Sequence, residues 1–340
     1  MIHRSKAPLR IGLAGGGTDV SPYSDQFGGA ILNATISLNA NATIEILNSN
    51  QIILEAIDRE ETETYDWLAS LPINGYLDLL KGVYNRIQKD YPFAKKGFRL
   101  STFVDAPAGS GLGTSSTLVV AIVGAFVEML QLPLGEYDIA HYAFEIERND
   151  LGLAGGRQDQ YAATFGGVNY MEFYGDDKVI VNPLRIRQRY IDELENNLLL
   201  YYTSKTRESA ELIKRQSQNV AEKKQSSIEA MHELKHQAQM MKEALLKGQL
   251  DEMGNILNIG FEQKRKMAEG INNRLIDDIY TAAKESGATG GKISGAGGGG
   301  FMIFYCPRNT KYDVMKNLEK FGGMARNYQF TKHGLKTWTV

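Results

Sequence analysis

The chain has 340 residues, of which 43% are hydrophobic and 23% charged, and its formal net charge is −2. This length favours two domains, and the lack of a basic excess argues against nucleic acid or an anionic membrane as the main partner. Cys306 is the only cysteine, and the sequence has neither an apolar leader nor a run of eighteen apolar residues, which excludes an intramolecular disulfide and favours a cytoplasmic protein.

The first half of the chain alternates short β-like runs with turns. Residues 31–47 and 98–104 have the pattern of strands, and residues 118–130 form one strongly apolar helix. Residues 165–174 read FGGVNYMEFY and predict a strand that starts after two glycines. We therefore expect a strand-rich first domain over residues 1–180.

The second half is richer in helices. A strand near residues 197–202 is followed by a long helical tract that ends near Gly287. Apolar residues recur in this tract at three- and four-residue steps, as on the buried face of an amphipathic helix. They are Ile228, Met231, Leu234, Ala238, Met241 and Leu245. A glycine run then leads into a strand at residues 301–306, so we predict an α+β chain with a second domain over residues 181–340.

A glycine- and serine-rich stretch, DAPAGSGLGTSST, occupies residues 105–117 directly before the apolar helix. Glycine permits positive φ and close approach, so several backbone N–H groups can converge on one anion at the positive end of the helix. The stretch is not a Walker A loop because no GK[ST] follows, and a plain turn with a serine cap is an alternative. The candidate phosphate-binding residues are Pro107, Gly109, Ser110, Gly111, Leu112, Gly113, Thr114, Ser115 and Ser116.

Two further stretches favour phosphate binding over a plain turn with a serine cap. Residues 8–19 read PLRIGLAGGGTD and residues 292–301 read KISGAGGGGF. Together with PAGSGLGTSST, these segments resemble, in order and spacing, the three motifs of the GHMP kinase family. The resemblance implies an α+β GHMP kinase fold, with an N-terminal domain like domain 2 of ribosomal protein S5 and a ferredoxin-like C-terminal domain. It also implies that ATP and Mg²⁺ bind, with the ATP phosphates at the middle motif and the acceptor alcohol between the domains.

The resemblance also implies roles for single residues. GGRQDQYAATFGG is similar to the family segment that holds the catalytic aspartate, which is Asp159 here, and Arg10 occupies the basic position of the first motif. Glu147 and Ser115 match the Mg²⁺ ligands, although Glu145 lies only two residues from Glu147. The expected contacts to substrate are Gly16, Gly17, Thr18, Asp19, Arg157, Arg207 and Gly297.

Elementary chemistry agrees with these roles. Phosphoryl transfer needs in-line positioning, charge neutralisation and a group that accepts or orients the hydroxyl proton. Asp159 can serve the last purpose, and a neighbouring Arg10 would stabilise the developing charge. One carboxylate and one hydroxyl suffice for Mg²⁺ when phosphates supply further oxygens. An inactive family member that only binds or senses a ligand would not need all of these groups.

The first motif also carries information about the substrate. It reads GGGTD where galactokinases have Gly-Glu-His-Thr-Asp, which argues against galactose. The sequence most resembles family members that phosphorylate the anomeric hydroxyl of D-glycero-D-manno-heptose 7-phosphate, and less closely the kinase half of fucokinases. A phosphorylated acceptor needs a second anion site, for which Arg4, Lys6, Arg157, Lys205 and Arg207 are candidates. The adenine pocket is expected near residues 65–84, and the oligomeric state is left open.

Two other motifs point to different functions. Residues 295–300 satisfy the G-x-G-x-x-G pattern of dinucleotide-binding enzymes, but they precede a strand instead of opening a helix. HELKH, from His232 to His236, is the H-E-x-x-H signature of zinc metallopeptidases. Lys235 between the histidines opposes zinc binding, and Leu234 belongs to the apolar stripe, so a metallopeptidase is only a remote alternative.

Overall fold

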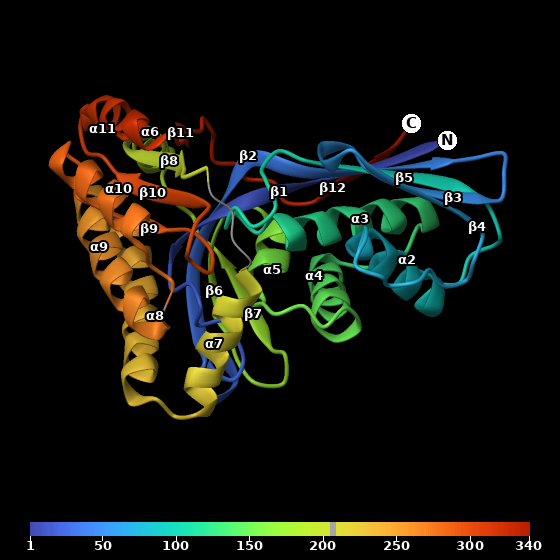
Figure 1. Ribbon diagram of the computed structural model, residues 1–340, viewed down its shortest axis with the longest axis horizontal. Helices are drawn as coiled ribbons and strands as arrows, with labels where there is room; N and C mark the ends of the chain where they lie inside the picture. Colours follow the sequence, from blue (N-terminus) through green and yellow to red (C-terminus); the bar gives the residue numbers. More distant parts are fainter. Residues whose placement is uncertain (205–208, 269) are drawn as a thin grey trace.

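Two β-sheets and the helices packed on them make up the computed structural model, which describes residues 1–204, 209–268 and 270–340 (Figure 1). Lys205 and Arg207, two candidates for the second anion site, lie outside the described residues. The larger sheet is built from the first half of the chain and its last strand, and the smaller sheet from the second half. The α+β architecture expected from the sequence is thus confirmed.

The larger sheet contains eight strands within the described residues. They are β1 (Ile2–Ala14), β2 (Gly29–Ile46), β3 (Gln51–Ala56), β4 (Glu61–Asp66), β5 (Phe98–Val104), β6 (Val168–Phe173), β7 (Val179–Pro183) and β12 (Lys336–Thr339). Their order is β12-β1-β2-β5-β3-β4, and β6 and β7 extend the sheet from β2. The first part of β2 pairs with β6 and its second part with β5, so this long strand connects two regions of the sheet.

Helices from the first half of the chain cover one face of this sheet (Figure 1). They are α2 (Asp78–Asp90), α3 (Thr114–Leu130), α4 (Glu136–Glu145) and α5 (Gln158–Phe165). The first half also contains a 3₁₀ turn (Ile57–Arg59), a π-helical turn (Ile146–Asp150) and a short α1 (Tyr23–Phe27), whose Tyr23 packs with residues of α7 and α8. The predicted apolar helix is α3, whose side chains from Val119 to Val123 are all buried in the core against the sheet. This packing fixes the start of α3, where the glycine-rich stretch ends.

The second sheet has the order β11-β8-β10-β9. Its strands are β8 (Leu198–Tyr202), β9 (Gly290–Ile293), β10 (Phe301–Tyr305) and β11 (Met324–Ala325). The helices of this part are α6 (Gln188–Asn197), α7 (Ser209–Ala221), α8 (Gln225–Lys247), α9 (Leu250–Met267), α10 (Arg274–Glu285) and α11 (Thr310–Leu318), followed by a 3₁₀ turn (Glu319–Phe321). The predicted helical tract is therefore interrupted, for example at Gly248, whose left-handed φ of 74° ends α8.

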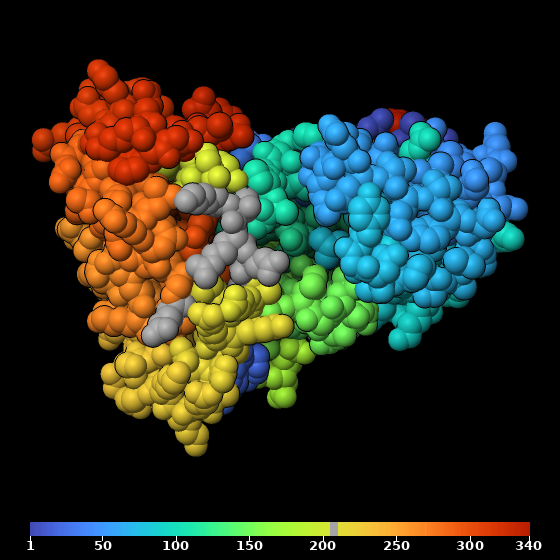
Figure 2. All heavy atoms as spheres, in the orientation of Figure 1, coloured from blue at the N-terminus to red at the C-terminus, as the bar shows by residue number. Residues whose placement is uncertain are grey.

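The two parts share one hydrophobic cluster, and the last strand returns to the sheet of the first part. One hydrophobic cluster combines Leu9 and Ile11 of β1 with Met241 of α8 and Ile303 of β10. The expected boundary at residue 180 falls inside β7, and β12 returns to pair with β1. The division into residues 1–180 and 181–340 thus stays a prediction. In the space-filling view, α7 and the start of α8 (yellow) lie between the orange helices and the green residues of α4 and α5 (Figure 2).

Candidate functional site

A cavity of about 580 Å³ opens where the two parts meet. The end of β1, the start of α3, the π-helical turn and the start of α5 line it from the first part, and α7, α9 and the loop after β9 line it from the second. Twelve of the residues proposed from the sequence lie in its wall: Arg10, Gly16, Gly17, Asp19, Gly109, Gly111, Gly113, Thr114, Ser115, Ser116, Glu147 and Asp159. The three sequence motifs thus converge on a single site.

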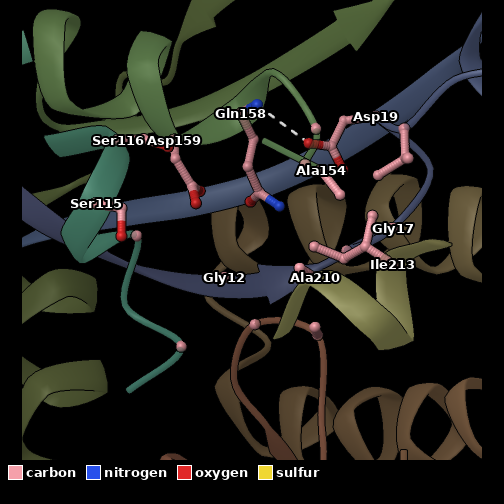
Figure 3. Close-up of a pocket in the computed structure, with 18 of the residues that line it drawn as sticks. Gly12, Gly17, Asp19, Ser115, Ser116, Ala154, Gln158, Asp159, Ala210 and Ile213 are labelled. Atoms are coloured by element: carbon pink, nitrogen blue, oxygen red, sulfur yellow. Dashed lines mark hydrogen bonds between the residues drawn. The ribbon is translucent and has the colours of Figure 1, made fainter. Parts of the chain in front are cut away.

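The glycine-rich stretch lies on the wall as an open backbone loop. Gly109, Gly111 and Gly113 have φ values of 71°, 86° and 76°, in the left-handed region that favours glycine. α3 begins at Thr114, and its N-cap is Gly113, without a side-chain cap. The serine cap of the alternative interpretation is therefore not formed. The hydroxyl of Ser115 is exposed to the cavity beside the unpaired N–H groups of the first turn, which favours an anion there (Figure 3).

The third motif and the strand after it are hydrogen-bonded to the backbone of this loop. Ser294 donates its hydroxyl to the carbonyl of Gly111 at 2.8 Å, and the N–H of Phe301 donates to the carbonyl of Ser110 at 2.8 Å. Ser110 and Leu112 are buried, and with Pro107 they lie outside the cavity wall. Their proposed contacts to ATP stay a prediction.

Gly297 corrects another expectation. A Cβ atom at this position would lie 2.8 Å from Ile271, so the residue is packed against the protein and does not line the cavity. Gly295 and Ala296, earlier in the same turn, line the cavity in its place.

Asp159 and Arg10 form the central ion pair of the cavity. The Nε and Nη2 atoms of Arg10 both contact Oδ1 of Asp159, at 2.7 and 2.6 Å, and Nη1 donates to the carbonyl of Gly111 at 2.6 Å. Arg10 therefore connects the carboxylate to the glycine loop. The second oxygen of Asp159 faces the same loop, since a Cβ atom at Gly113 would lie 3.1 Å from Oδ2. In Figure 3 the Asp159 side chain extends from the start of α5 into the cavity.

Asp19 lies on the other side of the start of α5. Its Oδ2 atom accepts the N–H groups of Arg157 at 3.0 Å and Gln158 at 3.1 Å, so it caps this helix from a distant part of the chain. Its Oδ1 atom is buried and has no hydrogen-bond partner among the described residues. Burial raises the pKa of Asp19, and the neighbouring Asp159 adds to this rise. An unpaired buried oxygen in a cavity wall is suited to accept a hydrogen bond from a hydroxyl group of a ligand.

Glu147 is a buried carboxylate in the π-helical turn. Its Oε2 atom accepts the Nε2 group of Gln160, which also donates to the hydroxyl of Ser116 at 3.2 Å. Burial raises the pKa of Glu147, and Arg148 counteracts this rise. Glu145, the alternative in the sequence, points elsewhere and is paired with Arg86 at 2.5 Å. Glu147 and Ser115 therefore offer a carboxylate and a hydroxyl to one cavity, a donor set that fits Mg²⁺ when phosphate oxygens complete it.

Other expected substrate contacts serve the structure instead. The guanidinium group of Arg157 is paired with Asp25 at 3.0 Å and Asp177 at 3.1 Å, outside the cavity wall. Thr18 is buried and donates its hydroxyl to the carbonyls of Gly15 and Ala30.

The remaining candidates for the second anion site lie elsewhere. Arg4 and Lys6 lie on β1 where it pairs with β12, outside the cavity wall.

Five polar residues of the wall were missed by the sequence analysis. They are Arg148, Gln158, Gln216, Lys264 and Lys292. Lys264 shows what signal was available: it follows Leu257 and Phe261 at helical spacing, so a lysine occupies a core position of α9. Lys292 is the first residue of the third motif and belongs to β9, whose four residues are all buried.

The H-E-x-x-H motif takes part in helix packing. The Nδ1 atom of His232 is hydrogen-bonded to the hydroxyl of Tyr23 at 2.8 Å, and its ring lies edge-on to Phe27. Lys235 donates to the carbonyl of Phe27 at 2.7 Å. No group of three or more His, Cys, Asp or Glu side chains suited to hold a metal occurs in the part of the chain that the structure describes. The motif therefore attaches α8 to α1, and the metallopeptidase alternative has no structural support.

No helix among the described residues is both long and apolar enough to cross a membrane.

Comparisons with known proteins agree with the site. The D-glycero-alpha-D-manno-heptose 7-phosphate kinase of Campylobacter jejuni is 46% identical over 337 residues, with 99% of each chain covered. The crystal structure of a D-glycero-D-manno-heptose 1-phosphate kinase from Bacteroides thetaiotaomicron is 47% identical, with a TM-score of 0.85 and 99% of each chain covered. An L-fucokinase/L-fucose-1-P guanylyltransferase of Bacteroides fragilis is 28% identical over 321 residues, which are 87% of this chain and 34% of that protein.

Family domains were also matched along the chain. Residues 78–167 match the N-terminal domain of the GHMP kinases, and residues 241–323 match the C-terminal domain. With the full-length relative at 46% identity and the three motifs gathered around one cavity, the chain belongs to the GHMP kinase family.

Proposed function

We propose that this chain is an ATP-dependent sugar kinase that phosphorylates the anomeric hydroxyl of D-glycero-D-manno-heptose 7-phosphate. The observation that carries the chemistry is the Arg10–Asp159 pair, which contacts the glycine loop in the wall of one cavity. The choice of sugar is supported by the names of the two relatives at 46% and 47% identity. Use of ATP as the donor also supports action in the cytoplasm.

The proposed reaction places the acceptor hydroxyl at the Oδ2 atom of Asp159. This carboxylate accepts the hydroxyl proton or orients the hydroxyl while the hydroxyl oxygen attacks the γ-phosphorus of ATP. The bond between the γ-phosphorus and the bridging oxygen breaks, and ADP leaves with its electron pair. Arg10 holds Asp159 in position through Oδ1 and adds positive charge beside the transferred phosphoryl group. The N–H groups at the start of α3 receive the phosphates of ATP, and Asp19 accepts a sugar hydroxyl at its unpaired Oδ1 atom.

Mg²⁺ is a further part of the proposal. Glu147 and Ser115 would hold it, because a buried carboxylate and a hydroxyl face the same cavity beside the phosphate loop. The ion would neutralise negative charge on the phosphates during transfer.

A second, smaller cavity of about 220 Å³ fits the base of ATP. Its wall is partly apolar, with Ile73, Leu77 and Leu79, and it includes residues of the segment 65–84 where the adenine pocket is expected. Leu153 lines both cavities, so a nucleotide can extend from this pocket to the phosphate loop.

ADP release with Mg-ATP and a panel of acceptors tests the proposal. The panel holds D-glycero-D-manno-heptose 7-phosphate, sedoheptulose 7-phosphate, fucose, galactose, mannose, mevalonate and homoserine. We expect turnover on the heptose phosphate and a loss of about 10²- to 10⁴-fold in kcat for Asp159→Asn. Asp192→Asn, at an exposed position of α6, is the matched control and should keep wild-type activity.

Other outcomes separate the alternatives. Turnover only on fucose would replace the heptose as substrate and keep the kinase. Full activity of Asp159→Asn would refute the assigned role of this residue. Binding of ATP without turnover on any acceptor would refute the proposed enzymatic activity and favour a protein that only senses its ligand.

A further inference from the structure

Two buried lysines in the cavity wall have no part in the chemistry described above. Lys264 on α9 and Lys292 on β9 are 4% and 6% exposed. We propose that these two lysines bind the phosphate that the acceptor sugar already carries. This inference rests on the proposed sugar kinase activity and adds the site that selects a phosphorylated acceptor.

Neither ammonium group has a counter-ion among the described residues. Lys264 donates to the carbonyl of Gly295, and Lys292 donates to the carbonyl of Gly12 at 2.9 Å. Within the described residues neither lysine forms an ion pair with a carboxylate, whereas Arg10 in the same cavity is paired with Asp159. A buried charge without a partner is unfavourable, and an anion in the cavity would remove this penalty.

A hydrogen-bond donor that is unpaired among the described residues lies on the same side of the cavity. Gln216 of α7 is 4% exposed, and its Nε2 group has no hydrogen-bond partner in the part of the chain that the structure describes. A Cβ atom at Gly17 would lie 3.6 Å from the Oε1 atom of this side chain, and one at Gly16 would lie 3.9 Å from the Nζ atom of Lys292. Two ammonium groups and one amide N–H group are the kinds of donor that a phosphate monoester requires.

The position of the two lysines favours the acceptor phosphate over the phosphates of ATP. The phosphates of ATP have their own donors at the start of α3. Lys292 and Gln216 instead lie against the first-motif loop of Gly16 and Gly17, which leads directly to Asp19, the proposed sugar contact. The charge of Asp19 also acts on Lys264. The two lysines are therefore grouped with the acceptor side of the cavity.

Burial and neighbouring positive charge lower the pKa of both lysines. Burial and the charge of Arg10 lower the pKa of Lys264 to about 8, and burial and the charge of Lys264 lower the pKa of Lys292 well below its ordinary value. An anion would favour the protonated form of both groups.

The decisive quantity is the ratio of kcat/KM for D-glycero-D-manno-heptose 7-phosphate to kcat/KM for the unphosphorylated heptose. Lys264→Met removes the charge while keeping a side chain of similar length, and we expect this ratio to fall about 10- to 100-fold, as for a lost charge-assisted hydrogen bond. Lys292→Gln is the second variant, with a fall in the same range, and it keeps the inference testable if Lys264→Met does not fold. Lys266→Met, two residues away at an exposed position of α9, is the matched control and should keep the wild-type ratio.

An unchanged ratio in folded Lys264→Met and Lys292→Gln would overturn the inference, whether both activities fall together or neither changes. A parallel loss on both sugars would instead place the lysines beside the transferred phosphoryl group. Failure of the proposed function is a separate result, since the wild-type protein would then turn over none of the sugars.

Discussion

Replacement of Lys264 by methionine should stabilise the protein without ligands at neutral pH. Lys264 is buried, and its pKa is about 8 in the folded chain instead of 10.5. At about 1.4 kcal/mol for each unit of pKa, holding this charge inside costs about 3 kcal/mol of folding free energy below pH 8. Loss of the hydrogen bond to Gly295 offsets about 1 kcal/mol of the gain. We therefore expect Lys264→Met to be about 2 kcal/mol more stable at pH 7.

The gain in stability of Lys264→Met depends on pH. The folded-state pKa lies below that of the unfolded chain, so the penalty is complete below about pH 8 and disappears as the pH rises toward 10.5. The groups that act on Lys264 through space are Arg10, which lowers its pKa, Asp19, which raises it, and the neighbouring Lys292. At pH 10 most of the penalty is gone, and Lys264→Met should be no more stable than the wild type.

Urea unfolding at pH 7 and pH 10, without nucleotide or sugar, measures both values. Lys266→Met should change the free energy of unfolding by no more than about 0.5 kcal/mol at either pH, because this lysine is exposed. A Lys264→Met protein that is less stable at pH 7, or a difference that is equal at both pH values, would refute the reasoning about the buried charge.

Three further changes test the other walls of the cavity. Asp19→Asn removes the charge of the unpaired oxygen, and we expect the KM for the sugar to rise about 10- to 100-fold; a change in the KM for ATP alone would contradict this role. Gly113→Ala places a Cβ atom 3.0 Å from the carboxyl carbon of Asp159, at a residue with a φ of 76°. We expect a lower kcat and, in urea unfolding, a loss of about 1–2 kcal/mol in the free energy of unfolding. A wild-type kcat would show that the loop is free to move. Glu147→Gln should raise the Mg²⁺ concentration for half-maximal activity at least about 10-fold, while Glu145→Gln serves as the control, and equal responses would exclude Glu147 as a ligand.

The sequence allowed the glycine loop to be found because its chemistry is local. Positive φ at Gly109, Gly111 and Gly113 is required by the turn itself, so the residue types reveal it. The pairing of Arg10 with Asp159, 149 residues apart, was expected only from the resemblance to a family. Spacing along the chain says nothing about contacts of that kind.

Burial explains the errors and omissions. Arg157 was expected to contact substrate, but Asp25 and Asp177 neutralise it outside the cavity. Lys264 was overlooked because it stands in the run EQKRK, which looks solvent-exposed, whereas helical spacing places it on the buried face of α9. The orientation of a side chain within a charged run depends on what packs against the helix, and the sequence of that helix alone does not contain this information.

The pairing of β12 with β1 has a consequence for the order of folding. The N–H and carbonyl groups of Ile2 are both bonded to Val340, so the two ends of the chain close one edge of the larger sheet (Figure 1). During synthesis that edge of β1 stays open until β12 leaves the ribosome, although the rest of the sheet precedes β12 by more than a hundred residues. Contacts between such distant residues form slowly, and an open strand edge is prone to pair with other chains. A nascent chain of this protein is therefore prone to aggregate through β1 until β12 has formed.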